Sequence, residues 1–317
     1  MQRFHVQMDD SNLTQFHCID ADALEPVSKG NRFQLTPRML GRLEHLAKAR
    51  FEVRPFGRGE MDDWRRLSVE DCHALAQSVN ASSQIENEHI RAEELDLVLA
   101  AVTQQEDNVV TAELSERARA VKSIYQTYLW ALKLDKKSFI DFDFVLEVHA
   151  RMFVTTKPEI AGRLKGRAVA IRGSGYNVMT LAPEKVPLYL RAVCARTNER
   201  LSRAQEFAEE SMLLIVAEFI LDFLAIHPFE DGNGRAARLL STYLLERAGY
   251  HFARFYPLDS VILETREAYY QALFLSQKDW FGESEDLTPW VEYYINSIYT
   301  QYLRAYQRVT DQRRDKL

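Results

Sequence analysis

The chain has 317 residues, 46% of them hydrophobic, which is enough to bury one large core or two moderate ones. Its formal net charge of −6 at pH 7 provides no general attraction to nucleic acid or to an anionic membrane, so we expect it to bind neither. The cysteines form no CxxC pair, which argues against a zinc cluster or a disulfide framework and favours a reducing, cytoplasmic location; they are Cys18, Cys72 and Cys194.

The first part of the chain is predicted to contain helices and one break. Residues 1–10 include acidic residues instead of a basic stretch followed by an apolar run, so they do not have the pattern of a secretory signal. Proline and glycine within 54–59 predict a break in the chain. Ser68 is a candidate helix N-cap, because Asp71 follows three residues later and an apolar stripe continues to Ser82.

Beyond residue 112, apolar residues recur every three or four positions, which is the spacing of helices that bury one face. The helices are predicted over 113–134, 141–153, 184–203, 208–226, 235–248, 265–276 and 288–310. The longest apolar run, Met212 to Ile226, is interrupted by Glu218 and Asp222 and is too short to span a bilayer. We expect it to be a buried core helix. The charged residues 311–317 are expected to fray into solvent.

One segment departs from the helical pattern. Val169 to Arg172 is rich in β-branched and apolar residues, a Gly-Ser-Gly turn follows, and Asn177 to Leu181 has the same character as the first run. Two such runs around a glycine turn predict a β-hairpin.

Polar and flexible residues are concentrated in the segment HPFEDGNGRAAR, residues 227–238, between two apolar helices. Gly232, Asn233 and Gly234 allow backbone angles that are closed to most residues, so that successive N–H groups can form an anion-binding concavity. A helix that begins at about Arg235 would add its free N–H groups and the positive end of its dipole. Arg235 and Arg238 lie three positions apart on that helix and can hold phosphate oxygens together.

Three further side chains of this segment have roles that follow from their chemistry. Asp231 is a hard oxygen ligand beside the concavity, suited to the Mg²⁺ that accompanies nucleotide phosphates. His227 can accept a proton at neutral pH, so it is suited to deprotonate a hydroxyl that attacks phosphorus. Phe229 is apolar within a polar loop, and we expect it to point into the core and pin the loop. The alternative for such a segment is a plain interhelical turn with a satisfied histidine.

The segment matches, at each defining position, the pattern His-x-Phe-x-Asp/Glu-Gly-Asn-Gly-Arg-x-x-Arg of the Fic family of nucleotidyltransferases. A joint match at so many positions argues against the plain turn. The chain resembles Fic proteins over most of its length, up to a Leu-Thr-Pro-Trp segment at 287–290. The resemblance implies a mainly α-helical bundle with a short β-hairpin flap. It also implies an N-terminal helical region over 1–105 and a catalytic domain with C-terminal helices over 106–317.

The resemblance further implies an activity, namely transfer of AMP from ATP to a serine, threonine or tyrosine hydroxyl of a target protein. By similarity, His227 is the catalytic base and Asp231 holds Mg²⁺. The remaining implied positions are the anion hole, Gly232, Asn233 and Gly234, and the phosphate contacts, Arg235 and Arg238. These roles agree with those expected from the residues themselves. The motif recognises phosphates rather than bases, so the choice of ATP over another nucleotide stays open.

A second match lies far upstream, where Ser82-Ser83-Gln84-Ile85-Glu86-Asn87 resembles the family's inhibitory pattern Ser/Thr-x-x-x-Glu-Gly/Asn. Ser82 and Glu86 are four positions apart and share one helix face. We expect Glu86 to pair with Arg238, which would take the arginine away from the γ-phosphate and place a negative charge where that phosphate should lie. The alternative is an exposed glutamate on a solvated helix. In some relatives the same glutamate helps water to remove AMP from the target.

Two weaker features complete the resemblance. The hairpin resembles the family's flap, which aligns a target segment as an added edge strand, although a surface hairpin without a target role is the alternative. Tyr270 lies, with Tyr269, in a region that borders the adenine pocket in the family, but an aromatic pair on a helix can equally belong to the core. Family members often self-associate, so a homodimer is a further expectation. His73, His89 and His149 show no ligand spacing and are assigned no role.

These features leave more than one function open. An autoinhibited protein adenylyltransferase accounts for both motifs. A phosphotransferase that moves a terminal phosphate is known among relatives of the wider superfamily, but those relatives lack the Gly-Asn-Gly sequence and the second arginine. A catalytically idle helical interaction module is the third possibility, because an inhibitory glutamate would make an intact enzyme look idle.

Overall fold

The computed structural model describes residues 7–8, 14–15, 32–52, 69–86, 90–103, 114–134, 139–173, 176–207, 211–254, 256, 258–280, 282 and 284–314. Within these residues the chain is mainly α-helical, as predicted. The helices are α1 (Pro37–Glu52), α2 (Val69–Ile85), α3 (Ala92–Thr103), α4 (Glu116–Leu132), α5 (Phe142–Phe153), α6 (Val186–Phe207), α7 (Met212–Ile226), α8 (Asn233–Arg247), α9 (Leu258–Glu264), α10 (Arg266–Gln277) and α11 (Thr288–Arg314), together with the short 3₁₀ helices η3 (Pro183–Lys185) and η4 (His251–Arg254).

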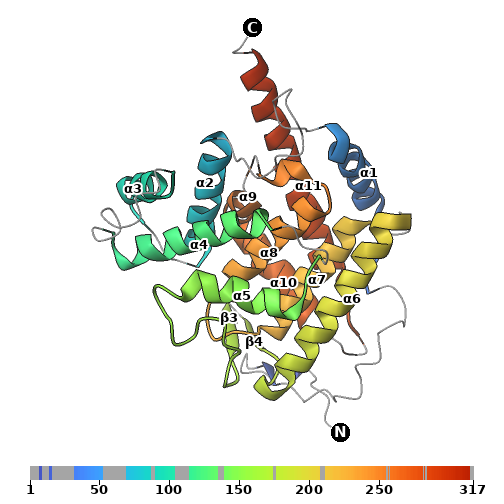
Figure 1. Ribbon diagram of the computed structural model, residues 1–317. Coiled ribbons are helices and arrows are strands. Elements are labelled where there is room, and N and C mark those ends of the chain that lie inside the picture. The colour runs from blue at the N-terminus through green and yellow to red at the C-terminus, as the bar shows by residue number, and fades with distance from the viewer. Residues whose placement is uncertain are drawn as a thin grey trace.

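Helices α7 and α8 pack together at the centre of the molecule, and the other helices surround them (Figure 1). Helices α6, α10 and α11 pack on α7, whereas α4 and α2 pack on α8. Every residue of α7 is buried, which confirms the predicted core helix. A helix that is apolar on all sides is stable in water only when neighbours cover it completely, and this composition explains its central place. The loop between α7 and α8 is therefore held by the most buried pair of helices.

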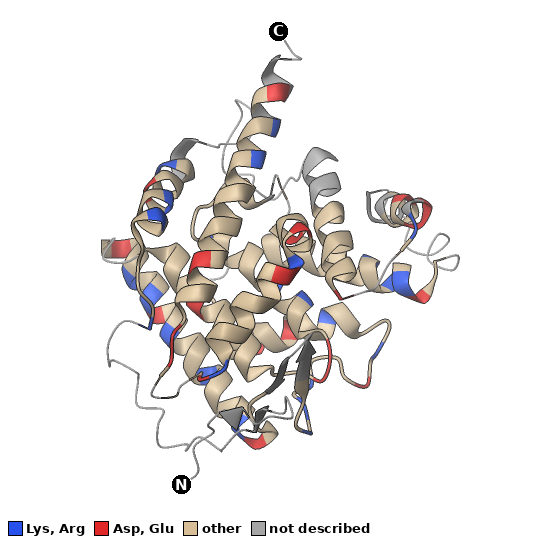
Figure 2. Ribbon diagram, turned by 180° about the vertical axis from the view of Figure 1, so that it is seen from behind, with Lys and Arg blue, Asp and Glu red and all other residues tan. Residues whose placement is uncertain are grey.

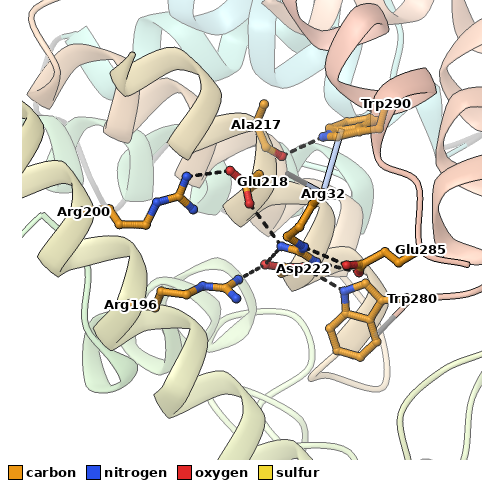
Figure 3. Close-up of polar contacts among 9 residues, drawn as sticks. All are labelled: Arg32, Arg196, Arg200, Ala217, Glu218, Asp222, Trp280, Glu285 and Trp290. Carbon is orange, nitrogen blue, oxygen red and sulfur yellow. Dashed lines mark hydrogen bonds and ion pairs between the residues drawn. The ribbon is translucent and has the colours of Figure 1, made fainter. Parts of the chain in front are cut away.

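The two acidic residues of α7 are buried and paired with arginines (Figure 3). Arg32 donates from Nη1 and Nη2 to the two carboxylate oxygens of Asp222, at 2.9 and 2.7 Å, and from Nη1 to Glu218 at 3.3 Å. The remaining partners are Glu285 for Arg32, Arg196 and Trp280 for Asp222, and Arg200 for Glu218. Burial alone would raise the pKa of Asp222, but Arg32 and Arg196 outweigh it and hold the pKa below its usual value.

Replacing Arg32 by methionine should destabilise the protein by about 2–4 kcal/mol, because it leaves buried carboxylates with fewer cations while preserving the bulk of the side chain. Unfolding in urea would measure this as a lower midpoint. A matched control is Lys48→Met, because Lys48 pairs with Glu44 at 3.0 Å on the exposed surface, where removal of a pair has no measurable effect. Equal midpoints for the two variants would contradict the stabilising role of Arg32.

The predicted hairpin is present. Strand β3 (Ala170–Gly173) pairs antiparallel with β4 (Tyr176–Met179), with Ala170 opposite Met179 and Gly173 opposite Tyr176. A second antiparallel pair joins the two-residue strands β1 (Gln7–Met8) and β2 (Thr14–Gln15). The β3–β4 hairpin lies below α5 and α10 in Figure 1, on the side of the molecule opposite the end of α11.

The structure departs from the sequence prediction in several helices. Helices α1, α3 and α9 were not predicted individually, and α8 begins at Asn233, two residues before the predicted start. Helix α11 continues to Arg314, so residues 311–314 of the expected frayed tail are helical, because the i to i+4 hydrogen bonds of a long helix continue into polar sequence. The predicted cap Ser68 and the predicted break at 54–59 lie outside the described residues. Side chains of α1 and α2 belong to the same buried cluster as those of α4 to α11.

In the ribbon of Figure 2, charged residues of both signs are found along the outer helices, whereas most of the ribbon at the centre is uncharged. This distribution agrees with the modest net charge of −6. Within the described part of the chain, no helix has the length and apolar character needed to cross a membrane.

Candidate active site

The loop that joins α7 to α8 begins at His227, which has an unusual backbone conformation. Its φ of 52° and ψ of 64° place it in the left-handed region, and it is the only residue other than glycine with positive φ among the described residues. Its backbone N–H donates to Phe223 O at 2.9 Å and closes the last turn of α7. A non-glycine residue in this region costs about 1–2 kcal/mol, so the surrounding contacts must hold it there.

The imidazole of His227 is only partly exposed and has a defined tautomer. Nδ1 lies 3.3 Å from Leu224 O. Because a carbonyl oxygen only accepts hydrogen bonds, Nδ1 carries the hydrogen and Nε2 keeps its lone pair. Burial, followed by the nearby charge of Lys165, lowers the pKa of His227 to about 4. The side chain is therefore neutral at physiological pH, with Nε2 available as a base.

Phe229 and His149 fix the middle of the loop. Phe229 is fully buried, as predicted, and stacks on His149 with ring centroids 3.7 Å apart and an interplanar angle of 7°. His149, on α5, also uses both ring nitrogens. Nδ1 accepts from Gly162 N at 3.1 Å, so Nε2 carries the hydrogen and donates to Asp231 O at 3.0 Å. A residue to which the sequence assigned no role thus holds the loop at two points.

We expect His149→Leu to destabilise the protein by about 2–4 kcal/mol, because it removes the stacked ring and leaves the Asp231 carbonyl and the Gly162 N–H without their partner. Chemical unfolding at pH 7 would measure the loss. His45→Leu is a suitable comparison, since the hydrogen bond of that ring to the Tyr299 hydroxyl, at 3.4 Å, is long and lies on the exposed surface, so its effect should be much smaller. Similar losses of stability in the two variants would argue against a role of His149 in holding the loop.

Glycine and asparagine shape the start of α8. Gly232 has a φ of 80°, and a Cβ at this position would lie 2.3 Å from Phe153 Cε2, so that both the backbone angle and the space require glycine. The side chain of Asn233 accepts from Phe229 N at 3.0 Å and donates to Phe229 O at 2.8 Å, which closes the loop. The first hydrogen bond of α8 runs from Ala236 N to Gly232 O. The backbone N–H groups that precede Ala236 in the first turn point outward from the N-terminal end of the helix.

Asp231 lies at the edge of the loop with its side chain 39% exposed. Oδ1 accepts from Gly232 N at 2.6 Å and from Arg235 Nη2 at 2.9 Å, and Oδ2 accepts from Lys157 Nζ at 2.6 Å. Burial alone would raise the pKa of Asp231, but Arg235 and Lys157 hold it below its usual value. The described residues contain no cluster of three metal-ligating side chains. One ionised carboxylate nevertheless fits Mg²⁺ bound to a nucleotide, because phosphates and water supply most of its ligands.

The two arginines of the motif lie in different surroundings. Arg235 is buried, pairs with Asp231 and lies 4.9 Å from the centroid of the Phe153 ring. Arg238 is buried on the other side and faces α2. Its Nε donates to Ser82 Oγ at 2.8 Å, and its Nη2 donates to Ser82 O at 2.9 Å. Among the described residues its Nη1 has no hydrogen-bond partner.

Glu86 lies directly over the first turn of α8. Its Oε1 accepts from Arg238 Nη2 at 2.9 Å. A Cβ added to Gly234 would lie 2.3 Å from the same oxygen, so the carboxylate touches the backbone of this glycine. Ser82, Glu86 and Arg238 are therefore brought together as expected from the sequence, although more than 150 residues separate Glu86 from Arg238. Asn87, the last residue of the pattern, lies outside the described residues.

The two tyrosines of α10 differ in their surroundings. Tyr269 is buried in a cluster of aromatic rings with Trp290 and Tyr293, as the core interpretation expects. Tyr270 is only partly buried, and its hydroxyl lies 3.5 Å from Ile85 O, next to Glu86. Tyr270 therefore borders the same space as the Glu86 carboxylate.

Residues 139–245, which include α5, the hairpin, α6, α7 and most of α8, match a family model described as the Fic/DOC family. This part of the chain is therefore identified as a Fic domain. Among curated proteins, the chain is 30% identical to protein adenylyltransferase fic-1 of Caenorhabditis briggsae over 154 residues, which are 49% of this chain and 26% of the relative. It is 29% identical to protein adenylyltransferase Fic of Nematostella vectensis over 146 residues, which are 46% of this chain and 31% of the relative. The matches thus span about a third of these relatives or less.

Solved structures show the same fold over most of the chain. A Fic family protein from Desulfovibrio desulfuricans has a TM-score of 0.65 at 21% identity, and the match covers 88% of this chain and 77% of the other. Fic-1 from Caenorhabditis elegans has a TM-score of 0.62 at 22% identity, with 87% and 74% covered. The fold therefore extends beyond the segment matched by the family model, which does not include Ser82, Glu86 or Tyr270.

Several residues at the loop between α7 and α8 were not found from the sequence. Asp259 on α9 lies 3.1 Å from Arg238 Nε and accepts from Ser78 Oγ at 2.5 Å, and burial raises the pKa of Asp259 despite the nearby arginine. The sequence also did not predict the pairing of Lys157 with Asp231 or the contact of His149 with the loop. None of these residues has a local sequence pattern, because each makes its contact through the fold.

Proposed function

We propose that this Fic protein transfers AMP from ATP to a serine, threonine or tyrosine hydroxyl of a target protein, and that Glu86 holds it in an inhibited state. The observation that carries the proposal is the Glu86 carboxylate, which lies on Gly234 and pairs with Arg238 at the first turn of α8. A carboxylate in that place occupies the anion site that a phosphate group would need. The relatives named protein adenylyltransferase support the type of reaction.

The phosphates would lie at the start of α8. The N–H groups of its first turn and the positive end of the helix dipole favour a polyanion there. Arg238 would bind the γ-phosphate once Glu86 moves aside. Its Nη1, which has no hydrogen-bond partner in the described part of the chain, would supply a further donor. Arg235 would contribute positive charge close to the same turn. Tyr270, at the edge of this space, would border the adenine.

The chemical step needs a base beside the α-phosphorus. The hydroxyl oxygen of the target forms a bond to the α-phosphorus, the bond from that phosphorus to the β-phosphate oxygen breaks, and pyrophosphate leaves. Nε2 of His227, which has a free lone pair, accepts the proton of the hydroxyl. Asp231 would hold Mg²⁺, which when bound would neutralise phosphate charge. Lys157 and Arg235 keep that carboxylate ionised and oriented.

The hairpin offers a way to present the target. A segment of the target would add as an edge strand to β3–β4, so that backbone hydrogen bonds place its hydroxyl near His227. Such recognition depends little on the target's side chains.

The proposal is tested by following label from ATP into protein. The Glu86→Gly variant is incubated with Mg²⁺, a protein extract and ATP labelled at either the α- or the γ-phosphate. We expect label from the α-phosphate in protein, either in the extract or in the chain itself, and none from the γ-phosphate. Mass spectrometry of the labelled protein should find the mass of AMP on a hydroxyl side chain.

The other outcomes identify the alternatives. Label from the γ-phosphate alone would establish a phosphotransferase and overturn the proposal. If neither label enters protein, calorimetry with ATP decides what remains. Nucleotide binding that Arg238→Ala abolishes, without any transfer, would favour an idle module with a retained site.

A further inference from the structure

Lys165 is buried between the loop and the hairpin, and the sequence analysis gave it no role. Its Nζ donates to Ile226 O at 3.0 Å and to Thr180 Oγ1 at 2.6 Å. Ile226 is the last residue of α7 and immediately precedes His227, whereas Thr180 immediately follows β4. The side chain of Lys165 is buried, with 3% of the residue exposed, so these bonds are shielded from water. One amino group therefore joins the loop to the hairpin.

The backbone of Lys165 contacts the other side of His227. Lys165 N donates to Pro228 O at 2.8 Å. The carbonyls immediately before and immediately after His227 thus both accept from the same residue. Because His227 has a left-handed backbone that is unfavourable for its side chain, it depends on tertiary contacts of this kind to keep its conformation.

On the hairpin side, the bond from Lys165 reaches the point where the two strands close. Thr180 Oγ1 donates to Val169 O at 2.8 Å, and Thr180 N donates to the same oxygen at 3.1 Å. A displacement of the hairpin relative to α7 would therefore stretch the bond between Lys165 and Thr180. One buried side chain thus links the hairpin directly to the residue that precedes His227.

Lys165 also affects the charge of the imidazole. After burial, its charge is the largest cause that lowers the pKa of His227, while Leu224 O, Glu86 and Asp231 oppose it. Burial lowers the pKa of Lys165 to about 7, so its positively charged form dominates between pH 4 and 7. This is the range in which an unperturbed histidine would become protonated. Lys165 is thus positively charged in the pH range in which its charge keeps the imidazole of His227 neutral.

We propose that Lys165 is a positioning residue for the transfer reaction. It holds His227 in a fixed position relative to the hairpin and keeps the imidazole of His227 in its basic form. The inference rests on the proposed function. A simpler possibility is that Lys165 only caps the C-terminal end of α7, which is a common place for a lysine. That possibility explains the bond to Ile226 O but not the bond to Thr180, and it predicts a change in stability alone.

The test uses the Glu86→Gly chain as parent and adds single substitutions. Lys165→Met removes the charge and the side-chain bonds at nearly equal length, and Lys165→Arg is its charged control. Thr180→Val removes the acceptor for Lys165 together with the bond from Thr180 Oγ1 to Val169 O, and it leaves the bond to Ile226 O in place. Thr180→Ser is its control with a retained hydroxyl. Label from the α-phosphate of ATP into the chain itself gives kcat and the KM for ATP, and NMR titration of imidazole resonances gives the pKa of His227.

Lys165→Met should lower kcat by about 10- to 100-fold with less than a 3-fold change in the KM for ATP, because it disturbs the base but not the phosphate site. Its His227 pKa should rise towards the ordinary value, whereas Lys165→Arg should keep the parent's pKa and recover most of the rate. Thr180→Val should lower kcat by about 3- to 10-fold without moving the His227 pKa, and Thr180→Ser should match the parent.

The results separate this inference from the proposed function. If the parent transfers AMP and a folded Lys165→Met matches it in kcat and in His227 pKa, Lys165 is only a helix cap and the inference is wrong. If Lys165→Met does not fold, the comparison of Thr180→Val with Thr180→Ser decides the inference, and equal kcat values for these two variants would overturn it. If the parent itself transfers nothing, the proposed function fails, whereas an unshifted His227 pKa in Lys165→Met would still refute the effect of the lysine on the imidazole.

Discussion

The Glu86→Gly variant is expected to transfer AMP about 10- to 100-fold faster than the wild-type chain. In the wild type the Glu86 carboxylate touches Gly234 and accepts a hydrogen bond from Arg238. A γ-phosphate at this place would be repelled by the negative charge of Glu86, and it would find Arg238 already paired. Loss of a charge-assisted hydrogen bond and of the repulsion is worth about 1.5–3 kcal/mol, which corresponds to this range of rates. The measurement is the initial rate of label transfer from the α-phosphate at saturating ATP.

Two substitutions test whether the charge of Glu86 is responsible. Glu86→Gln keeps the shape of the side chain and a hydrogen bond to Arg238 but removes the charge, so it should fall between wild type and Glu86→Gly. Ser82→Ala removes the acceptor of Arg238 Nε, at 2.8 Å, and leaves Glu86 in place, so it should not activate the enzyme. Equal rates of transfer for the wild type and Glu86→Gly would contradict inhibition by Glu86.

The second large effect is expected at His227. In the activated Glu86→Gly background, His227→Asn should lower the rate of transfer about 10²- to 10⁴-fold, which is the usual contribution of a general base. Asparagine is a better choice than alanine, because it tolerates the left-handed conformation, with φ of 52°, that this position requires. Its side chain can also donate to Leu224 O. A loss of rate with unchanged stability would therefore report on chemistry.

The pH dependence provides an independent check of the same residue. The pKa of His227 is lowered to about 4, so the base stays unprotonated as the pH falls below 6.5. The acid limb of kcat/KM is therefore expected near pH 4 rather than near 6.5. Rates of the Glu86→Gly variant should be nearly constant between pH 7 and 5.5, and a tenfold loss over that interval would contradict the assignment.

The parts of the site that could be predicted are those encoded by local sequence. Gly232 and Asn233 lie next to each other, and their backbone angles and hydrogen bonds depend on neighbours within a few residues. The apolar run of α7 likewise predicts its own burial. The pair of Glu86 with Arg238 was expected only because both patterns are similar to those of a known family, since no periodicity relates residues so far apart.

The residues that could not be predicted make their contacts with parts of the chain that are distant in sequence. His149 stacks on Phe229 from another helix, Lys165 reaches Thr180, and Asp259 approaches Arg238 from α9. A lone histidine, lysine or aspartate has no spacing that distinguishes it from a surface residue. Helix α9 has only seven residues, which is too short for an apolar repeat to be recognised.

The way α2 is packed limits how the proposed inhibition by Glu86 could be relieved. Val79 and Ile85 are completely buried, and α2 packs against α4, α8 and α9. Detaching the helix would expose several such side chains at about 1.5–3 kcal/mol each, whereas rotating the Glu86 side chain about its own bonds exposes none of them. The switch is therefore expected to be a change of rotamer at the end of a stationary helix, fast enough for ATP to compete with it directly. It also acts within one polypeptide, so dilution of the protein would not release it.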